Sequence, residues 1–120
     1  MTRIENARLT YDGEIHIGVS RLIVTFTIHW TESERVADTG FELNVTLYGK
    51  DPCRDDYLCG ESVGYSVNGL ATQDVTHSFL VGTDRLNEDW GRDEIYAHIT
   101  IRPLTFVPVS ANTNDIQGRF

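Results

Sequence analysis

The residue types best suited to metal chemistry are concentrated between positions 83 and 94. Five carboxylates and one amide lie in this stretch: Asp84, Asn87, Glu88, Asp89, Asp93 and Glu94. Hard oxygen ligands crowded on one segment are what Ca²⁺ requires, although the spacing is not that of an EF-hand loop. A solvated acidic loop, partly neutralised by Arg85 and Arg92, is the commoner outcome. We therefore expect no cofactor and keep Ca²⁺, bound by the first five of these residues, as the alternative.

Aromatic and imidazole side chains are the candidates for a partner or ligand surface, namely Trp90, Tyr57, Tyr96 and His98. Trp90 does not belong to any of the alternating apolar series, so it either caps the core or is exposed. An exposed Trp90 would be an anchor for a partner or a platform for a sugar ring. Tyr96 and His98 point away from the core by strand parity, as do Tyr48 and His29. If their strands are neighbours, they form one polar, aromatic face. Ordinary cross-strand pairing explains the same residues.

Two cysteines flank a short acidic stretch that also contains Tyr57. A disulfide between Cys53 and Cys59 would close a small ring and stabilise the fold by about 2–2.5 kcal/mol in the chain-entropy model. Two unpaired thiols in a reducing compartment are the alternative. No second Cys pair or close His pair completes a four-ligand zinc set.

The patterns that would indicate catalysis are weak. Residues 60–64 match Gly-x-Ser-x-Gly, with Ser62 at the centre, but a nucleophile elbow needs a helix to follow, and the sequence continues as a strand. Glu88 and Asp93 could act as paired acids of a small hydrolase, yet a compact domain offers little room for a substrate cleft. We expect that the chain is not an enzyme.

The elements that would position these residues are strands. Apolar and polar residues alternate over residues 21–31, 41–48 and 94–102. The inward series are Leu22, Val24, Phe26, Ile28 and Trp30; Phe41, Leu43, Val45 and Leu47; and Ile95, Ala97, Ile99 and Ile101. One apolar and one polar face predicts antiparallel sheet.

Weaker strands complete the fold. Asp12-Gly13 and Asn68-Gly69 predict two-residue hairpin turns. His77, between Val75 and Phe79, is expected to be a hydrogen-bonded core residue. About eight short strands predict one all-β domain over residues 1–120, an antiparallel two-sheet β-sandwich of immunoglobulin-like or C2-like type. A small closed barrel is the alternative.

The composition excludes several function classes. The 120 residues carry 18 acidic and 10 basic side chains, a net charge of −8. Such a surface repels a phosphate backbone, so we expect no nucleic-acid partner. No apolar run is long enough to span a membrane, and the first residues do not form a secretory signal. We expect a chain that is cytoplasmic at synthesis or incorporated into an assembly.

These observations favour a non-catalytic protein-interaction or assembly module, such as a subunit of a phage or bacterial surface particle. Its partner would be another protein or a second copy of the chain. The alternative is a ligand-binding domain, lectin-like or calcium-dependent, that uses the acidic segment around Trp90, which makes a glycan a possible ligand.

Overall fold

A computed structural model describes residues 2–33, 40–49, 56–66, 71–86, 93–103 and 109–118. These residues form eight strands and the short helix α2 (Thr83–Leu86). The strands are β1 (Arg3–His16), β2 (Val19–His29), β3 (Gly40–Gly49), β4 (Asp56–Ser66), β5 (Thr72–Gly82), β6 (Asp93–Pro103), β7 (Val109–Asn112) and β8 (Ile116–Gly118).

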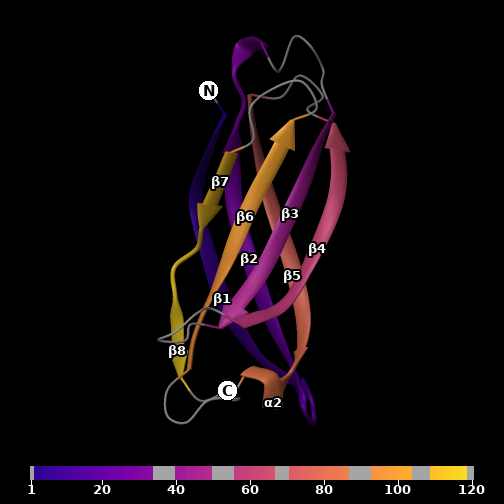
Figure 1. The fold of residues 1–120 in the computed structure, drawn as a ribbon, viewed down its shortest axis with the longest axis vertical. Helices are drawn as coiled ribbons and strands as arrows, with labels where there is room; N and C mark the ends of the chain where they lie inside the picture. The colour runs from indigo at the N-terminus through magenta and orange to yellow at the C-terminus, as the bar shows by residue number, and fades with distance from the viewer. Residues whose placement is uncertain are drawn as a thin grey trace.

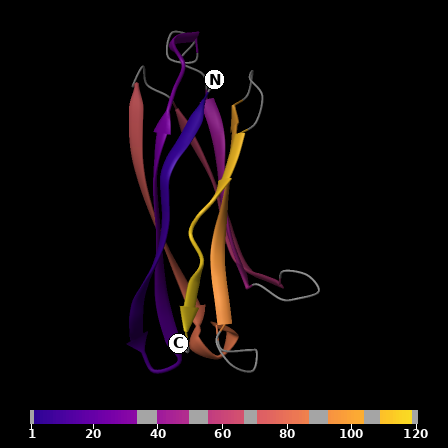
Figure 2. The ribbon, with the colours of Figure 1, turned by 90° about the vertical axis from the view of Figure 1, so that its left-hand side faces the viewer.

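The strands form two antiparallel sheets. The first has the order β1-β2-β5, and the second has the order β4-β3-β6-β7, with β8 also paired to β6. Figure 1 shows β3 and β6 in front of the first sheet, and Figure 2 shows the two layers edge-on. The chain changes sheets after β2 and again after β4, so that β5 returns beside β2 in a Greek-key connection. The sandwich prediction is confirmed over the closed-barrel alternative.

The core lies between the two sheets and follows the predicted alternation. All thirteen inward residues of the three predicted strands are buried, from Leu22 on β2 to Ile101 on β6. Together with Leu9, Leu58, Val75, Phe79, Val81 and Leu86 they form one hydrophobic cluster. Because both sheets contribute an apolar face to the same cluster, each sheet is left with one polar face towards solvent.

The predicted hairpin turn at Asp12-Gly13 is wrong. Strand β1 continues through both residues, and the chain reverses at positions 17–18 instead. Gly13 has a φ of 104°, and the β1–β2 register shifts between Tyr11 and Gly13, so the dipeptide forms a bulge within the strand. Bulges and primed turns both favour glycine at positive φ, so the dipeptide alone does not distinguish them.

The Asn68-Gly69 prediction lies outside the described residues. Its flanking strands, β4 and β5, belong to different sheets. These two strands are therefore not paired with each other as the strands of a hairpin would be.

One side of the sandwich is closed by the residues between β7 and β8. The Asn114 side chain accepts a hydrogen bond from the Leu9 backbone N–H at 2.8 Å and donates one to the Leu9 carbonyl at 3.3 Å. The Thr113 hydroxyl accepts a bond from the Ala97 N–H at 2.8 Å. A side-chain amide thus pairs with β1 as a strand would, which joins the two sheets at this side.

A buried polar cluster fixes α2 to the β1–β2 turn. The Ser20 and Thr83 hydroxyls share a hydrogen bond of 2.8 Å, and Thr83 also donates to the Glu14 carboxylate at 3.2 Å. The Thr83 backbone N–H donates to the Gly18 carbonyl at 2.9 Å. Ser20 is fully buried. Its hydroxyl is hydrogen-bonded within this cluster, so its burial leaves no unpaired polar group.

Candidate functional site

Three tyrosines form a row across the outer face of the second sheet. Tyr48 on β3 pairs in register with Tyr57 on β4 and with Tyr96 on β6. The Tyr48 and Tyr96 rings are stacked with centroids 5.6 Å apart, and the Tyr57 ring meets Tyr48 edge-on at 6.4 Å. We call the outer face of β4, β3, β6 and β7 that contains this row the tyrosine face.

A bulge in β4 brings Tyr57 into the row. Leu47 pairs with Cys59 and the next residue, Tyr48, pairs with Tyr57, so Leu58 is the extra residue. Leu58 turns into the core, whereas Tyr57 is 59% exposed. Strict alternation from the inward Cys59 would have turned Tyr57 inward, so the bulge reverses the direction of this side chain.

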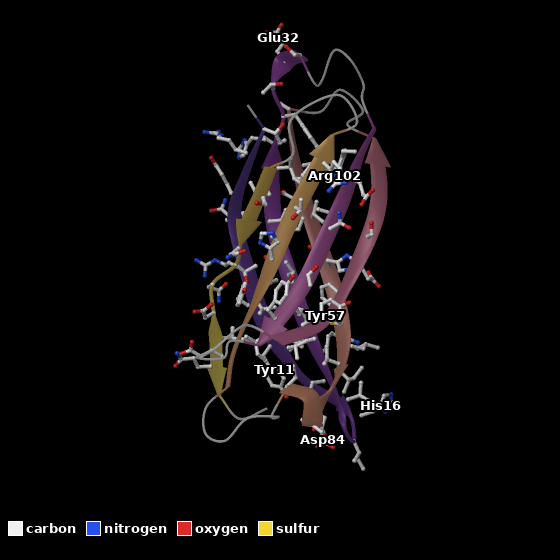
Figure 3. All side chains as sticks on the ribbon, viewed as in Figure 1. Tyr11, His16, Glu32, Tyr57, Asp84 and Arg102 are labelled. Atoms are coloured by element: carbon white, nitrogen blue, oxygen red, sulfur yellow. The ribbon has the colours of Figure 1, made fainter. Side chains whose placement is uncertain are left out.

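Small polar side chains cover the face beyond the tyrosines. By strand register they are Thr46, His98 and Asn112 in one row, and Ser62, Asn44, Thr100 and Ser110 in the next. The His98 ring is hydrogen-bonded to the Asn112 side chain. Figure 3 shows Tyr57 towards one end of the face and Arg102 towards the other. The arrangement presents aromatic rings beside many hydrogen-bonding groups.

Gly60 leaves the tyrosine face without a side chain at one position beside the tyrosine row. A Cβ at this position would lie 3.2 Å from the Thr46 hydroxyl and 3.3 Å from the Val45 carbonyl. Both separations are tighter than ordinary van der Waals contact, so the strands approach closely here because the residue has no side chain.

A small hydrogen-bonded group surrounds Glu42 near the Arg102 end of the face. Asn44 Nδ2 donates to Glu42 Oε1 at 3.0 Å, and Ser62 Oγ donates to the same oxygen at 3.2 Å. Hydrogen bonds to a carboxylate stabilise its charged form. The Asn44 bond first, then the Ser62 bond and the Arg102 charge, therefore hold the Glu42 pKa below its ordinary value.

This group gives a prediction for pH titration. We expect Asn44→Ala and Ser62→Ala each to raise the Glu42 pKa towards 4.5, its ordinary value. Because the pKa is lower in the folded state, the contribution of Glu42 to stability is present above the unfolded pKa and is lost as pH falls through the folded one. Carbon-detected NMR titration of the Glu42 carboxyl measures the change. Thr100→Ala is the control, and equal pKa values in all variants would contradict this assignment.

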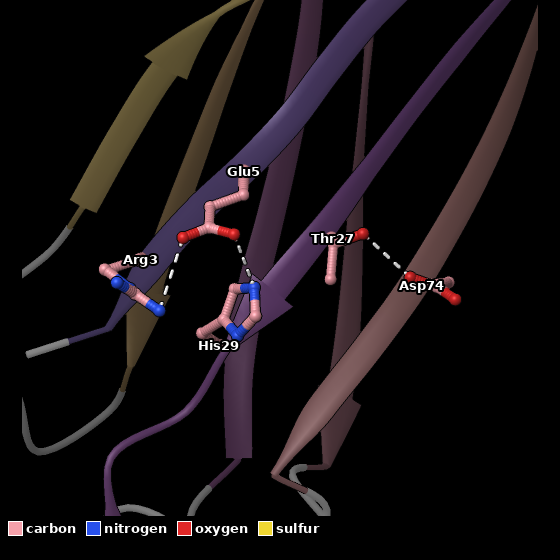
Figure 4. Close-up of polar contacts among 5 residues, drawn as sticks. All are labelled: Arg3, Glu5, Thr27, His29 and Asp74. Carbon is pink, nitrogen blue, oxygen red and sulfur yellow. Dashed lines mark hydrogen bonds and ion pairs between the residues drawn. The ribbon is translucent and has the colours of Figure 1, made fainter.

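His29 does not belong to the tyrosine face, although its parity is also outward. It lies on β2 of the other sheet, where its Nε2 is 2.9 Å from a Glu5 carboxylate oxygen. Arg3 contacts the other oxygen of Glu5 at 3.3 Å, and on the same face Thr27 donates to Asp74 at 2.8 Å, as Figure 4 shows. The outer face of this sheet therefore carries charged side chains, Arg3, Glu5 and Asp74 among them.

The two ends of the acidic segment lie in regular elements. It begins in α2, where Asp84 is exposed and Leu86 is buried in the core, and it ends in β6, which includes Asp93. Asn87, Glu88, Asp89 and Trp90 lie outside the described residues. Within the described ranges, no three His, Cys, Asp or Glu side chains group as a metal site. Calcium binding here stays a prediction.

Part of the stretch expected to be a loop between the two cysteines is a strand. Tyr57 and Cys59 lie within β4, and Cys59 packs against the core. Cys53 lies outside the described residues, so the disulfide stays a prediction.

Ser62 and His77 occupy strand positions. Ser62 is in the interior of β4, paired with Asn44, and not at a turn. His77 on β5 points inward, lies with its ring centroid 4.8 Å from that of Phe79, and contacts the Glu61 carboxylate of β4 through its Nε2. Ser62 therefore does not lie at the sharp strand-to-helix turn that a nucleophile elbow requires.

The sequence interpretation missed Glu42, Asn44 and Ser62 as members of one site. Asn44 and Glu42 are outward by the same parity that identified Tyr48, so alternation contained the signal for two of them. Ser62 joins the site because β4 lies beside β3 in the sheet. Alternation within one strand does not show which strands are its neighbours.

Strand order and connections define the class of this protein, an immunoglobulin-like antiparallel β-sandwich. No protein-family model and no curated protein matches the sequence. No helix in the described ranges has both the length and the apolar character needed to cross a membrane.

Solved structures show the same fold. The chain is similar to part of a glycosyl hydrolase family 2 member from Bacteroides cellulosilyticus, with a TM-score of 0.63 and 10% identity over 92% of this chain. It spans only 15% of that protein. It is also similar to a protein from Archaeoglobus fulgidus, with a TM-score of 0.59 and 11% identity over 98% of both chains. At these identities the likeness extends to the fold alone.

Proposed function

We propose that the chain is a non-catalytic protein-interaction module that binds its partner through the tyrosine face. The row formed by Tyr48, Tyr57 and Tyr96 is the observation that carries this proposal. Tyrosine supplies a large, rigid contact area at low entropic cost, and it is enriched where interfaces derive most of their binding energy.

The distribution of charge supports this choice of surface. The protein carries a net charge of −8, yet the two polar rows beside the tyrosines contain no carboxylate or guanidinium group. Glu42 and Arg102 lie at one end of the face, and Glu94, hydrogen-bonded to Gln117, lies beyond the tyrosine row at the other end. The outer face of the other sheet carries Arg3, Glu5 and Asp74. Centres of interfaces are depleted of charge, so the tyrosine face is the better candidate.

A glycan is the second candidate ligand for the same surface. The stacked Tyr48 and Tyr96 rings lie beside hydroxyl, amide and imidazole groups. Saccharides combine C–H faces that pack on aromatic rings with hydroxyls that bond to such groups. A calcium-dependent form of this activity would use the acidic segment that begins at Asp84.

Alanine variants of the tyrosines test the proposal. Proteins captured from an extract of the producing cells by the immobilised chain are identified, purified and measured by biolayer interferometry. We expect Tyr57→Ala and Tyr96→Ala each to weaken binding at least about 30-fold, which corresponds to the ~2 kcal/mol that marks an interface hot spot. Leu80→Ala is the matched control, because Leu80 is 61% exposed on the other sheet and should leave affinity unchanged.

The outcomes separate the two candidates. A partner whose affinity is insensitive to both tyrosine variants would contradict docking by the tyrosine face. Glycan-array binding that both variants abolish would favour the saccharide ligand instead. The same array run with Ca²⁺ and with chelator shows whether the acidic segment contributes.

A further inference from the structure

Opposite charges lie at the two ends of the tyrosine face. Along β6, every second residue from Glu94 to Arg102 points outward, because the residues between them are buried. His98 lies midway, so the carboxylate and the guanidinium are equally far from the centre of the strand, on opposite sides of it. A copy of this face that is turned end for end would therefore set each of the two charges against its opposite.

We infer that the tyrosine face binds the same face of a second copy of the chain. The two sheets would pack face to face, about a twofold axis that crosses β6 over His98 in the plane of the contact. Each strand then lies over its own copy and runs antiparallel to it. Glu94 of each copy faces Arg102 of the other, which gives two opposite-charge contacts. This inference rests on the proposed function, because it names the partner of the same surface.

Side-chain size is complementary about the same axis. The tyrosine row lies one step to one side of the axis, and the row that contains Asn44 and Thr100 lies one step to the other. End-for-end packing places Tyr48 over Asn44 and Tyr96 over Thr100, so tall side chains meet short ones. The tyrosine hydroxyls then lie beside hydroxyl and amide groups to which they can hydrogen-bond. The row between them meets itself, and Gly60 leaves that row without a side chain at one position.

The two charges that meet can each take a further partner. Gln117 donates to Oε1 of Glu94, and a carboxylate accepts several hydrogen bonds. Arg102 lies beside Glu42 of its own copy, which already accepts bonds from Asn44 and Ser62. A guanidinium has five N–H donors, enough to bond to Glu94 of the other copy as well.

The net charge of −8 weakens such a dimer without preventing it. Glu5 and Asp74 lie on the outer face of the other sheet. Two spacings of about 10 Å, one between the sheets of a copy and one across the contact, separate them from the nearest sheet of the second copy. This distance exceeds the Debye length of about 8 Å at physiological ionic strength. We therefore expect the dimer to be weakest at low salt.

The size of the contact indicates a transient dimer. Four strands about 4.8 Å apart, over the stretch from Glu94 to Arg102, cover about 500 Å² on each copy. The total of about 1,000 Å² is in the range of weak, transient interfaces. We therefore expect micromolar to millimolar affinity.

Reversal of the two charges tests the inference by sedimentation equilibrium at physiological ionic strength. We expect Glu94→Arg and Arg102→Glu each to weaken the dimer at least about tenfold, because each sets like charges against one another at two places. The double variant with both changes should return to within about threefold of wild-type affinity. The two single variants shift the net charge in opposite directions, so net charge alone cannot weaken both.

Matched controls make the same changes of charge on the other sheet. They are Asp74→Arg and Arg8→Glu, both at exposed outer positions, and neither should weaken the dimer more than about twofold. Isotope-filtered NMR of mixed labelled and unlabelled wild-type protein gives a second measurement that needs no variant. Contacts between the Tyr96 ring of one copy and the Thr100 methyl of the other are the expected result.

Four results would overturn the inference. They are a monomer at millimolar concentration, equal weakening by test and control variants, no recovery in the double variant, and no contact between Tyr96 and Thr100 of different copies. A monomer whose captured partner still depends on Tyr57 and Tyr96 would leave the proposed function intact. A captured partner that is insensitive to both tyrosine variants would instead contradict the proposed function.

Discussion

Replacing Ile99 by alanine is expected to lower the free energy of unfolding by about 2–5 kcal/mol, the largest effect that this account predicts for a single residue. Ile99 is fully buried and lies in the middle of β6, opposite Val45 on one side and Ala111 on the other. Its removal leaves a cavity between two sheets that are held together by their apolar faces. Urea unfolding followed by tryptophan fluorescence measures the change.

The neighbouring residue supplies the control for Ile99. Thr100 has the opposite parity and faces solvent on the tyrosine face, so Thr100→Ala should change stability by no more than about 0.5 kcal/mol. The contrast between adjacent positions isolates the direction of the side chain, because both substitutions have the same strand context. Equal losses at the two positions would contradict the assigned faces of β6.

Replacing Asn114 by alanine is expected to destabilise the fold by about 1–3 kcal/mol, the second largest effect. The change removes both hydrogen bonds between this side chain and the Leu9 backbone. Leu9 is buried at 3% exposure, so its N–H and carbonyl would lose their partners beside the core. Thermal and urea unfolding measure the loss, and hydrogen exchange should become faster at the Leu9 amide.

Asn112 provides a matched comparison for Asn114. It is the same residue type two positions earlier, exposed on β7, and its side chain contacts His98 rather than the backbone of β1. Asn112→Ala should therefore have an effect of about 0.5 kcal/mol or less. If the two alanine variants unfold alike, the Asn114 side chain does not join the sheets as described.

The sequence predicted the fold well because burial on one face determines strand parity. Phe26, Val45 and Ile99 were placed inward by alternation alone, and all three are buried. Each strand carries this signal itself, and no knowledge of its neighbours is needed. The antiparallel sandwich followed because two such faces must cover one another.

The site was less predictable, because it depends on features that alternation does not encode. The bulge at Leu58 reverses Tyr57, and only the adjacency of β3 to β4 and β6 brings the three tyrosines together. The bonds of Asn114 to Leu9 span 105 positions in sequence. The hairpin turn predicted at Asp12-Gly13 was wrong because a bulge and a turn favour the same residues.

Site-specific photo-crosslinking tests the central claim most directly, namely that partners bind on the tyrosine face. A benzophenone amino acid replaces Thr46, which adjoins the tyrosine row, or Thr25, which lies at the centre of the outer face of the other sheet. We predict that the Thr46 variant crosslinks to a captured partner and the Thr25 variant does not. Crosslinking from Thr25 alone would contradict this assignment and place the docking surface on the β1-β2-β5 sheet.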